Sequence, residues 1–175
     1  MLRLTRAGEY AIRGMCYLAQ QPTDKLTLIG DIAKEQGCSA SFLAKIFQSL
    51  SKAGLIDSQR GVSGGVSLAC VPEEINLKQI IEAVEGAIAL NLCLLPQGRC
   101  EYAAQCRMAD IWQEAQTRFL DVLERATLRN LQEAYVFGPG WLEDSNEDPN
   151  ENSDENPNEH SDEGPAQKQG ENQEV

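Results

Sequence analysis

Apolar residues recur every three or four positions along the first third of the chain, the period of an α-helix that buries one face. The pattern covers residues 5–20, 28–36 and 40–53. Gly37 is suited to the left-handed position that closes a helix, and Ser39 is suited to cap the next one. We expect three helices, the third of which buries the apolar residues Leu43, Ile46, Phe47 and Leu50.

Two short helices joined by a tight turn that contains glycine are typical of a helix-turn-helix. Beyond Gly54 the pattern changes, and two short runs of strand type, residues 55–60 and 66–69, flank a glycine-rich tip. A β-hairpin in this place makes the wing of a winged helix. The sequence therefore predicts a mainly α fold, a winged helix-turn-helix domain with a small β-hairpin wing.

The region after the wing is predicted to be helical again, with one irregular segment. A capping-box pattern at Asn76 opens a helix over residues 77–85. Residues 86–106 show no period and are expected to form a loop. A long amphipathic helix follows over residues 109–126, and a short one over residues 128–135.

Charge is distributed unevenly along the chain, which has a formal net charge of -12. Residues 1–71 carry eight basic and five acidic side chains, whereas residues 143–175 carry one basic and twelve acidic ones. A mildly basic front suits a nucleic-acid partner, although the net charge by itself argues against one. The acidic end contains only two apolar residues, too few to offset the entropy of ordering it, so we expect a disordered acidic C-terminal tail.

Several classes of protein are not expected from this sequence. No stretch of 18 apolar residues is present, and the start of the chain lacks the apolar core of a secretory signal, so we expect a cytoplasmic protein with no membrane partner. The single histidine, His160, lies in the acidic end, and the chain carries no phosphate-binding loop and no nucleophile motif. An enzyme is therefore not expected.

The exposed face of the third helix and the glycine-rich tip provide candidate contacts to double-stranded DNA. Small donors and a cation in the first half of that helix can reach base edges, whereas Lys52, near its end, lies close to phosphates. Arg60 beside the tip suits a narrow minor groove. Phe42 suits either a core position or a contact with a thymine methyl group, and a helix-turn-helix that serves only protein contacts is the alternative. The candidate DNA-binding residues are Ser39, Ser41, Phe42, Lys45, Lys52, Arg60, Gly61, Gly64 and Gly65.

Three cysteines stand close together in or beside the predicted loop, at Cys93, Cys100 and Cys106. In a reducing compartment such clusters are more often metal ligands or redox centres than structural disulfides. Arg99 and Arg107 stand beside them and favour the thiolate, which is the form that binds metal. The sequence leaves three possibilities open: an iron–sulfur cluster, a zinc ion, or a metal-free thiol switch in which two thiols form a disulfide on oxidation.

Three thiolates leave one ligand position of a cluster or zinc ion to be filled. His160 stands 54 residues beyond Cys106 and is not expected to fill it. A carboxylate, a thiol such as Cys16, a backbone group or an exogenous molecule remains, and an oxygen ligand would give the lability that a sensor needs. Cys16, Cys38 and Cys70 are otherwise predicted to be small buried side chains.

Short segments of the first helix, the helix-turn-helix and the wing occur together in a specific combination. These segments are Leu4-Thr5, Tyr10-Ala11-Ile12-Arg13, Ile32-Ala33, Ser39-Ala40-Ser41-Phe42-Leu43, Gly54-Leu55-Ile56 and Arg60-Gly61-Val62-Ser63-Gly64-Gly65. With the three cysteines, they resemble the Rrf2 family of winged-helix transcriptional regulators over residues 1–135, in the branch that binds an iron–sulfur cluster. The resemblance implies a repressor whose affinity for a palindromic operator follows the state of a 2Fe-2S or 4Fe-4S cluster.

The resemblance also implies a homodimer that crosses through the long helix, at the interface residues Trp112, Ala115, Phe119 and Val122. It divides the chain into a winged helix-turn-helix domain over residues 1–86, a cluster loop over residues 87–108, a dimerisation helix with a terminal helix over residues 109–137, and the acidic tail over residues 138–175.

Two departures from the family pattern concern the cluster. The gap between Cys93 and Cys100 is one residue longer than usual, and Ala109 stands where one branch has a histidine ligand. The resemblance therefore points to the branch of redox and nitric oxide sensors, in which an acidic residue from the first helix of the partner subunit completes the site. That position is Glu9 here, and its alternative role is a solvated carboxylate near the start of the first helix.

Overall fold

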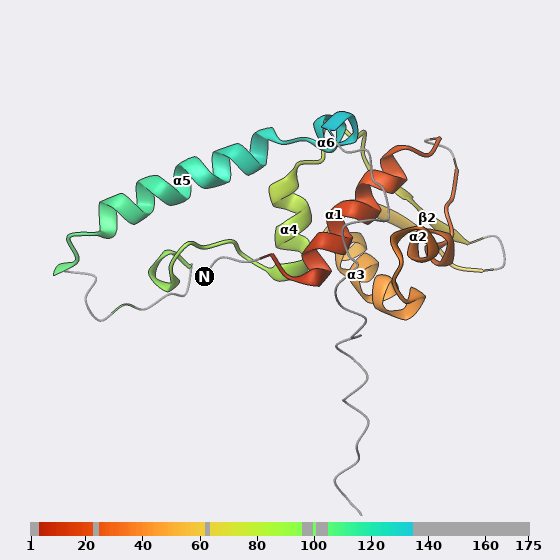
Figure 1. The fold of residues 1–175 in the computed structure, drawn as a ribbon, viewed down its shortest axis with the longest axis horizontal. Coiled ribbons are helices and arrows are strands. Elements are labelled where there is room, and N and C mark those ends of the chain that lie inside the picture. Colours follow the sequence, from red (N-terminus) through yellow and green to blue (C-terminus); the bar gives the residue numbers. More distant parts are fainter. Residues whose placement is uncertain (1–3, 23–24, 62–63, 96–99, 101–104, 135–175) are drawn as a thin grey trace, which may run out of the picture. The chain divides into compact units, whose positions relative to one another are not determined.

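Six α-helices, one short 3-10 helix and a two-stranded antiparallel sheet make up the part of the chain that the structure describes (Figure 1). The structure is a computed structural model that describes residues 4–22, 25–61, 64–95, 100 and 105–134, all within one unit, Met1–Pro139. The elements are α1 (Arg6–Ala19), α2 (Ile29–Gln36), α3 (Ala40–Lys52), β1 (Ile56–Gln59), β2 (Gly65–Leu68), α4 (Leu77–Glu85), η1 (Leu92–Leu94), α5 (Ala109–Arg125) and α6 (Leu128–Ala134).

The first three helices begin and end where the sequence pattern predicts, within a residue or two. Thr5 caps α1, because its hydroxyl accepts a hydrogen bond from the backbone N–H of Gly8 at 3.3 Å. The hydroxyl of Ser39 accepts from the N–H of Phe42 at the start of α3, also at 3.3 Å. Gly37 closes α2 with φ at 67°, the left-handed conformation that glycine adopts without strain. The predicted helix-turn-helix is confirmed.

The predicted wing is confirmed as the hairpin of β1 and β2. The strands pair antiparallel from Ile56 opposite Leu68 to Gln59 opposite Gly65. Thr27, just before α2, extends the pairing, because it exchanges two backbone hydrogen bonds of 2.9 Å with Val66. The wing is thereby tied to the start of the helix-turn-helix.

The core lies where α1, α3 and α4 pack together (Figure 1). The apolar residues predicted on the buried face of α3 are at most 4% exposed. Phe47 is the largest fully buried side chain of the described residues and lies against α1. Other fully buried residues of this core are Met15, Cys16, Ile32, Leu43, Leu50, Ile56, Ile75, Ile80 and Leu128.

The helix α5 joins the cysteine-bearing segment to the rest of the fold (Figure 1). Its C-terminal half packs on α4, where Leu123 is 9% exposed. Lys78 of α4 lies 2.8 Å from Glu124 of α5, and this hydrogen bond raises the pKa of the Lys78 side chain. Both an apolar contact and an ion pair therefore fix α5 to α4.

The acidic tail, predicted to be disordered, lies outside the residues that the structure describes. Among the helices that the structure describes, none combines the length and apolar character that crossing a membrane requires.

Candidate functional site

A hollow lies between α3 and the wing, with a volume of about 540 Å³. Lys52 of α3 and Arg60 at the end of the wing line it together, as do Gln48, Ser51 and Ser58. Two cations beside an amide and two hydroxyl groups form a surface that can donate hydrogen bonds to phosphate oxygens. The fold therefore brings together two candidate DNA contacts, Lys52 and Arg60, that are separated in the sequence.

The structure adds Ser51 and Ser58 to the candidate contacts predicted from the sequence. Ser51 lies one helical turn beyond Gln48, and Ser58 points from the same hairpin that carries Arg60. The helical period could have indicated Ser51. The position of Ser58 depends on how the hairpin packs against α3, which the local sequence does not reveal.

The start of α3 carries the other predicted contacts of this helix. Ser39, Ser41 and Lys45 are exposed, and the hydroxyl oxygens of Ser39 and Ser41 lie 3.3 Å apart. Phe42 is half-buried against the core, and its ring meets the ring of Tyr10 edge to face, with centroids 5.7 Å apart. Phe42 thus has a packing role in this structure.

The glycines of the wing have conformational roles of their own. Gly61 has φ at 120°, and a Cβ at Gly64 would overlap the backbone oxygen of Gln59 and lie 2.9 Å from that of Gly61. The hairpin tip therefore excludes a side chain at position 64.

Replacing Gly64 with alanine is expected to lower the free energy of unfolding by about 1–3 kcal/mol, because the new methyl group overlaps backbone atoms. Gly30→Ala is the matched control, since a Cβ at this position in α2 meets nothing within 4 Å. Urea unfolding of both variants checks the effect. Equal stability of the two variants would contradict the predicted overlap.

The three predicted cysteine ligands line one cavity of about 270 Å³ at the start of α5. Cys93 comes from η1, whereas Cys100 and Cys106 precede α5, and all three are half-buried. Asp110 and Gln113 of α5 complete the polar lining. In chemical type, three thiols with an adjacent carboxylate suit an iron–sulfur cluster or a zinc ion.

Within the described residues, no three cysteine, histidine, aspartate or glutamate side chains lie close enough to share a single metal ion.

The other cysteines do not line this cavity. Cys16 is fully buried in the core, and this burial raises the pKa of its thiol to about 12, so it stays protonated and is poorly suited as a ligand. Cys38 is half-buried, as a small side chain near the core. The prediction that Cys70 is buried is wrong: Cys70 is exposed, because it lies in the bend after β2 rather than in the strand.

Gln116 holds the segment that leads into the cavity, a role not predicted from the sequence. It is 6% exposed, and its side-chain amide donates to the carbonyl of Ile88 at 2.7 Å and accepts from the N–H of Leu90 at 2.9 Å. The signal in the sequence is a single amide on the apolar stripe of α5, between Trp112 and Phe119. Gln116 thereby ties the residues before Cys93 to α5.

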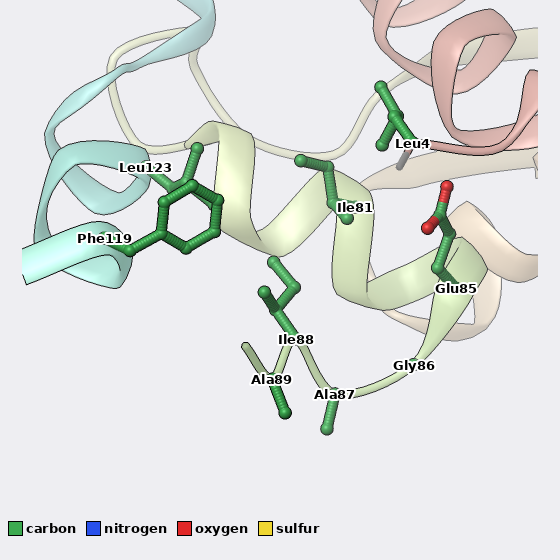
Figure 2. Close-up of a pocket in the computed structure, with 9 residues that line it drawn as sticks. All are labelled: Leu4, Ile81, Glu85, Gly86, Ala87, Ile88, Ala89, Phe119 and Leu123. Atoms are coloured by element: carbon green, nitrogen blue, oxygen red, sulfur yellow. The ribbon is translucent and has the colours of Figure 1, made fainter. Parts of the chain in front are cut away.

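The predicted dimer residues of α5 lie in two different environments. Phe119 lines an apolar cavity of about 280 Å³ between α4 and α5, which also contains Leu123, Ile81 and Glu85 (Figure 2). Trp112 and Ala115 are half-buried, and Val122 is 65% exposed. Phe119 therefore contacts its own subunit, whereas Val122 is available to a partner. The exposed apolar side chains of α5 and its N-cap are Met108, Ile111 and Val122.

Glu85 connects this apolar cavity to the start of α1. Figure 2 shows its carboxylate at the side of the cavity that Leu4 lines. One oxygen of Glu85 accepts from both the N–H and the hydroxyl of Thr5, each at 2.9 Å. Glu9 lies one turn further along α1, half-buried, and does not line the cysteine cavity of its own chain. One subunit therefore does not bring Glu9 to the three cysteines.

Comparison with known proteins identifies the family. Residues 4–134 match the family model Rrf2, described as an iron-dependent transcriptional regulator. The chain belongs to the Rrf2 family. Among its Rrf2 relatives, the HTH-type transcriptional regulator NsrR of Halalkalibacterium halodurans is 36% identical over 131 residues, which are 74% of this chain and 90% of that protein.

Other members of the Rrf2 family are similar in sequence or structure. The HTH-type transcriptional regulator IscR of Aliivibrio salmonicida is 32% identical over 130 residues, covering 74% of this chain and 77% of that protein. The solved structure of CymR, the global cysteine regulator of B. subtilis, matches with a TM-score of 0.64 and 27% identity over 77% of this chain and 99% of that one. The chain is accordingly a transcriptional regulator of the Rrf2 family, a family of winged-helix DNA-binding proteins rather than enzymes.

Proposed function

We propose that this Rrf2 regulator is a repressor that binds a palindromic operator as a homodimer, and that an iron–sulfur cluster held by Cys93, Cys100 and Cys106 controls its affinity for DNA. The observation that carries the proposal is the shared cavity of the three cysteines at the start of α5. The similarity to NsrR and IscR favours the same interpretation.

The DNA contacts of the proposal belong to α3 and the wing. Ser39, Ser41 and Lys45 are exposed on the first half of α3, the part of a recognition helix that enters the major groove. Lys52 and Arg60 line the hollow beside the wing and provide positive charge for phosphates or a narrow minor groove. This arrangement favours DNA over a purely protein partner.

The proposed dimer uses α5, whose exposed apolar residues include Ile111 and Val122. Unpaired apolar surface of this kind favours contact with a second copy of the helix. The family resemblance offers Glu9 of the partner subunit as one candidate for the fourth ligand. A carboxylate in that position would make the ligand set labile toward oxidants or nitric oxide.

The chain's own contacts offer a route between the cysteine cavity and the recognition helix. Ligation of Cys93 together with Cys106 would hold η1 against the start of α5, to which Gln116 already ties the preceding segment. The other end of α5 packs on α4, and α4 packs on both α1 and α3. A cluster bound by the three cysteines would supply redox-sensitive iron–thiolate bonds, and these would tie η1 to the start of α5.

A metal-free thiol switch is the second candidate function. The observation that favours it is the structural match to the cysteine regulator CymR. In this case two of the three cavity cysteines would form a disulfide on oxidation and change the same contacts.

Spectroscopy and metal analysis of protein purified without oxygen distinguish these functions. Absorbance between about 320 and 460 nm with stoichiometric iron and sulfide is the expected result for the cluster. A colourless protein that contains zinc, or that takes up no iron and sulfide on reconstitution, would overturn the cluster assignment. Mass spectrometry of the oxidised, metal-free protein would then test for the disulfide.

Lys52→Ala is expected to weaken binding to a mixed-sequence duplex of about 30 base pairs and to reduce the slope of log K against log salt concentration by about 0.9, because one phosphate contact is lost. Lys34→Ala is the matched control, since Lys34 is exposed on α2 and does not line the hollow. Fluorescence anisotropy over a salt series measures both slopes. An equal slope in the two variants would remove Lys52 from the proposed DNA surface.

A further inference from the structure

Among the residues that the structure describes, Asp110 is the one acidic side chain that lines the cysteine cavity. It lies in the first turn of α5, four positions after Cys106. Its side chain lies on the same face of α5 as that of Gln113, three positions further on, and both line the cavity. The carboxylate of Asp110 thus lines the same cavity as all three thiols.

The other acidic residues of α5 are engaged elsewhere. Glu114 pairs with Arg118 at 2.6 Å, Asp121 pairs with Arg125, and Glu124 pairs with Lys78 at 2.8 Å. Asp110 makes no hydrogen bond or ion pair with any residue that the structure describes. The carboxylate of Asp110 takes part in none of these ion pairs, so it is available to a ligand in the cavity.

The start of α5 adds a second electrostatic feature. Unlike Thr5, Ser39 and Asn76 at other helix starts, the N-cap residue Met108 makes no side-chain hydrogen bond to the first turn. The N–H groups of this turn give the helix start partial positive charge. Negative charge is therefore favoured next to this end of α5, where the cavity lies.

We propose that Asp110 is an oxygen ligand of the cluster, supplied by the same subunit as Cys93, Cys100 and Cys106. The inference rests on the proposed cluster and changes the source of its fourth ligand. A complete ligand set from one chain does not need Glu9 of the partner subunit for the cluster to be bound. Three thiolates with one oxygen ligand form a labile set, because oxygen is a harder ligand than sulfur. A carboxylate of Asp110 gives the same lability as one of Glu9.

The test compares Asp110→Asn and Glu9→Gln with the wild-type chain, each reconstituted without oxygen from ferrous iron and sulfide. Asp110→Asn is expected to shift the visible spectrum and to lose iron to a chelator about tenfold faster, as weakened ligand sets do. Glu9→Gln is expected to keep the wild-type spectrum and rate. Asp110→Glu, which retains a carboxylate, is expected to recover most of the wild-type behaviour.

Two controls separate a ligand from a merely structural role. Asp121 belongs to the same helix, pairs with Arg125 and lies outside the cavity. The spectrum of Asp121→Asn should therefore match that of the wild type. Thermal unfolding of metal-free Asp110→Asn reports any loss of helix stability independently of the spectrum.

The outcomes distinguish this inference from the proposed function. Wild-type protein that takes up no iron and sulfide would overturn both. A coloured wild type with an unchanged spectrum and rate of iron loss in Asp110→Asn would overturn the role of Asp110 alone. Loss of the cluster in Glu9→Gln with no change in Asp110→Asn would assign the position to Glu9.

Discussion

Replacing Cys93 with alanine is expected to abolish the visible absorbance of the anaerobically purified protein and to change its affinity for operator DNA. Cys93 is the thiol that η1 contributes to the cavity, whereas Cys100 and Cys106 both precede α5. Its loss leaves two of the three thiols in the cavity. The remaining pair is too few to hold the cluster against exchange with solvent.

The effect on DNA follows from where Cys93 stands in the fold. Without ligation of this residue, the contact between η1 and the start of α5 depends on apolar packing and on the hydrogen bonds of Gln116. We therefore expect the affinity of Cys93→Ala for its operator to differ from that of the cluster-bound wild type and to match that of wild-type protein stripped of iron.

Cys70→Ala is the matched control for this experiment, because Cys70 is exposed and does not line the cavity. Iron and sulfide analysis, the visible spectrum and anisotropy on a duplex selected from random sequence are measured for both variants. Unchanged operator affinity in Cys93→Ala would reject the switching mechanism, even if the chromophore is lost.

Phe47→Ala is expected to lower the free energy of unfolding by about 3–5 kcal/mol, a large part of the roughly 5–15 kcal/mol that stabilises a typical domain. Phe47 is 2% exposed and fills the space between α1 and α3, where its ring would touch any side chain added at Gly14. Because α1 packs closely against it, the cavity left by the ring cannot collapse easily.

Phe42→Ala removes the same group from the same helix and serves as the comparison. Phe42 is half-buried and meets Tyr10 edge to face, so a smaller loss is expected. Denaturant unfolding of the metal-free chains gives both free energies. An equal or smaller loss for Phe47→Ala would show that the interface between α1 and α3 repacks around the missing ring.

Local patterns were sufficient to predict the elements of the winged helix. Thr5, Ser39 and Asn76 cap helices as their side chains predict, because a cap bonds to backbone groups two or three residues away. Exposure of Cys70 was not predictable in the same way. Its neighbours in sequence are apolar, but β2 ends before it and the core does not reach it.

The candidate sites were predicted less completely than the elements, because they combine distant segments. The spacing of the cysteines indicated a common site, but no local pattern places Asp110 beside it. The single amide of Gln116 on the apolar stripe of α5 is a local signal, but it does not identify the backbone groups that Gln116 binds. Phe119 was expected only at a dimer interface, on the basis of family resemblance, and the structure places it against α4 of its own chain. The helical period identifies an apolar stripe and does not say which neighbour covers it.

The sequence by itself determined the order and limits of the helices, the wing, the family and the three thiols, because these depend on periodicity, capping and motif residues that act over a few positions. Only the tertiary structure decided that Lys52 and Arg60 line one hollow, that Glu85 binds the start of α1, and that the cysteines share a cavity with Asp110. Each of these contacts depends on how helices pack, and packing is set by the burial of apolar surface across the whole core rather than by neighbouring residues.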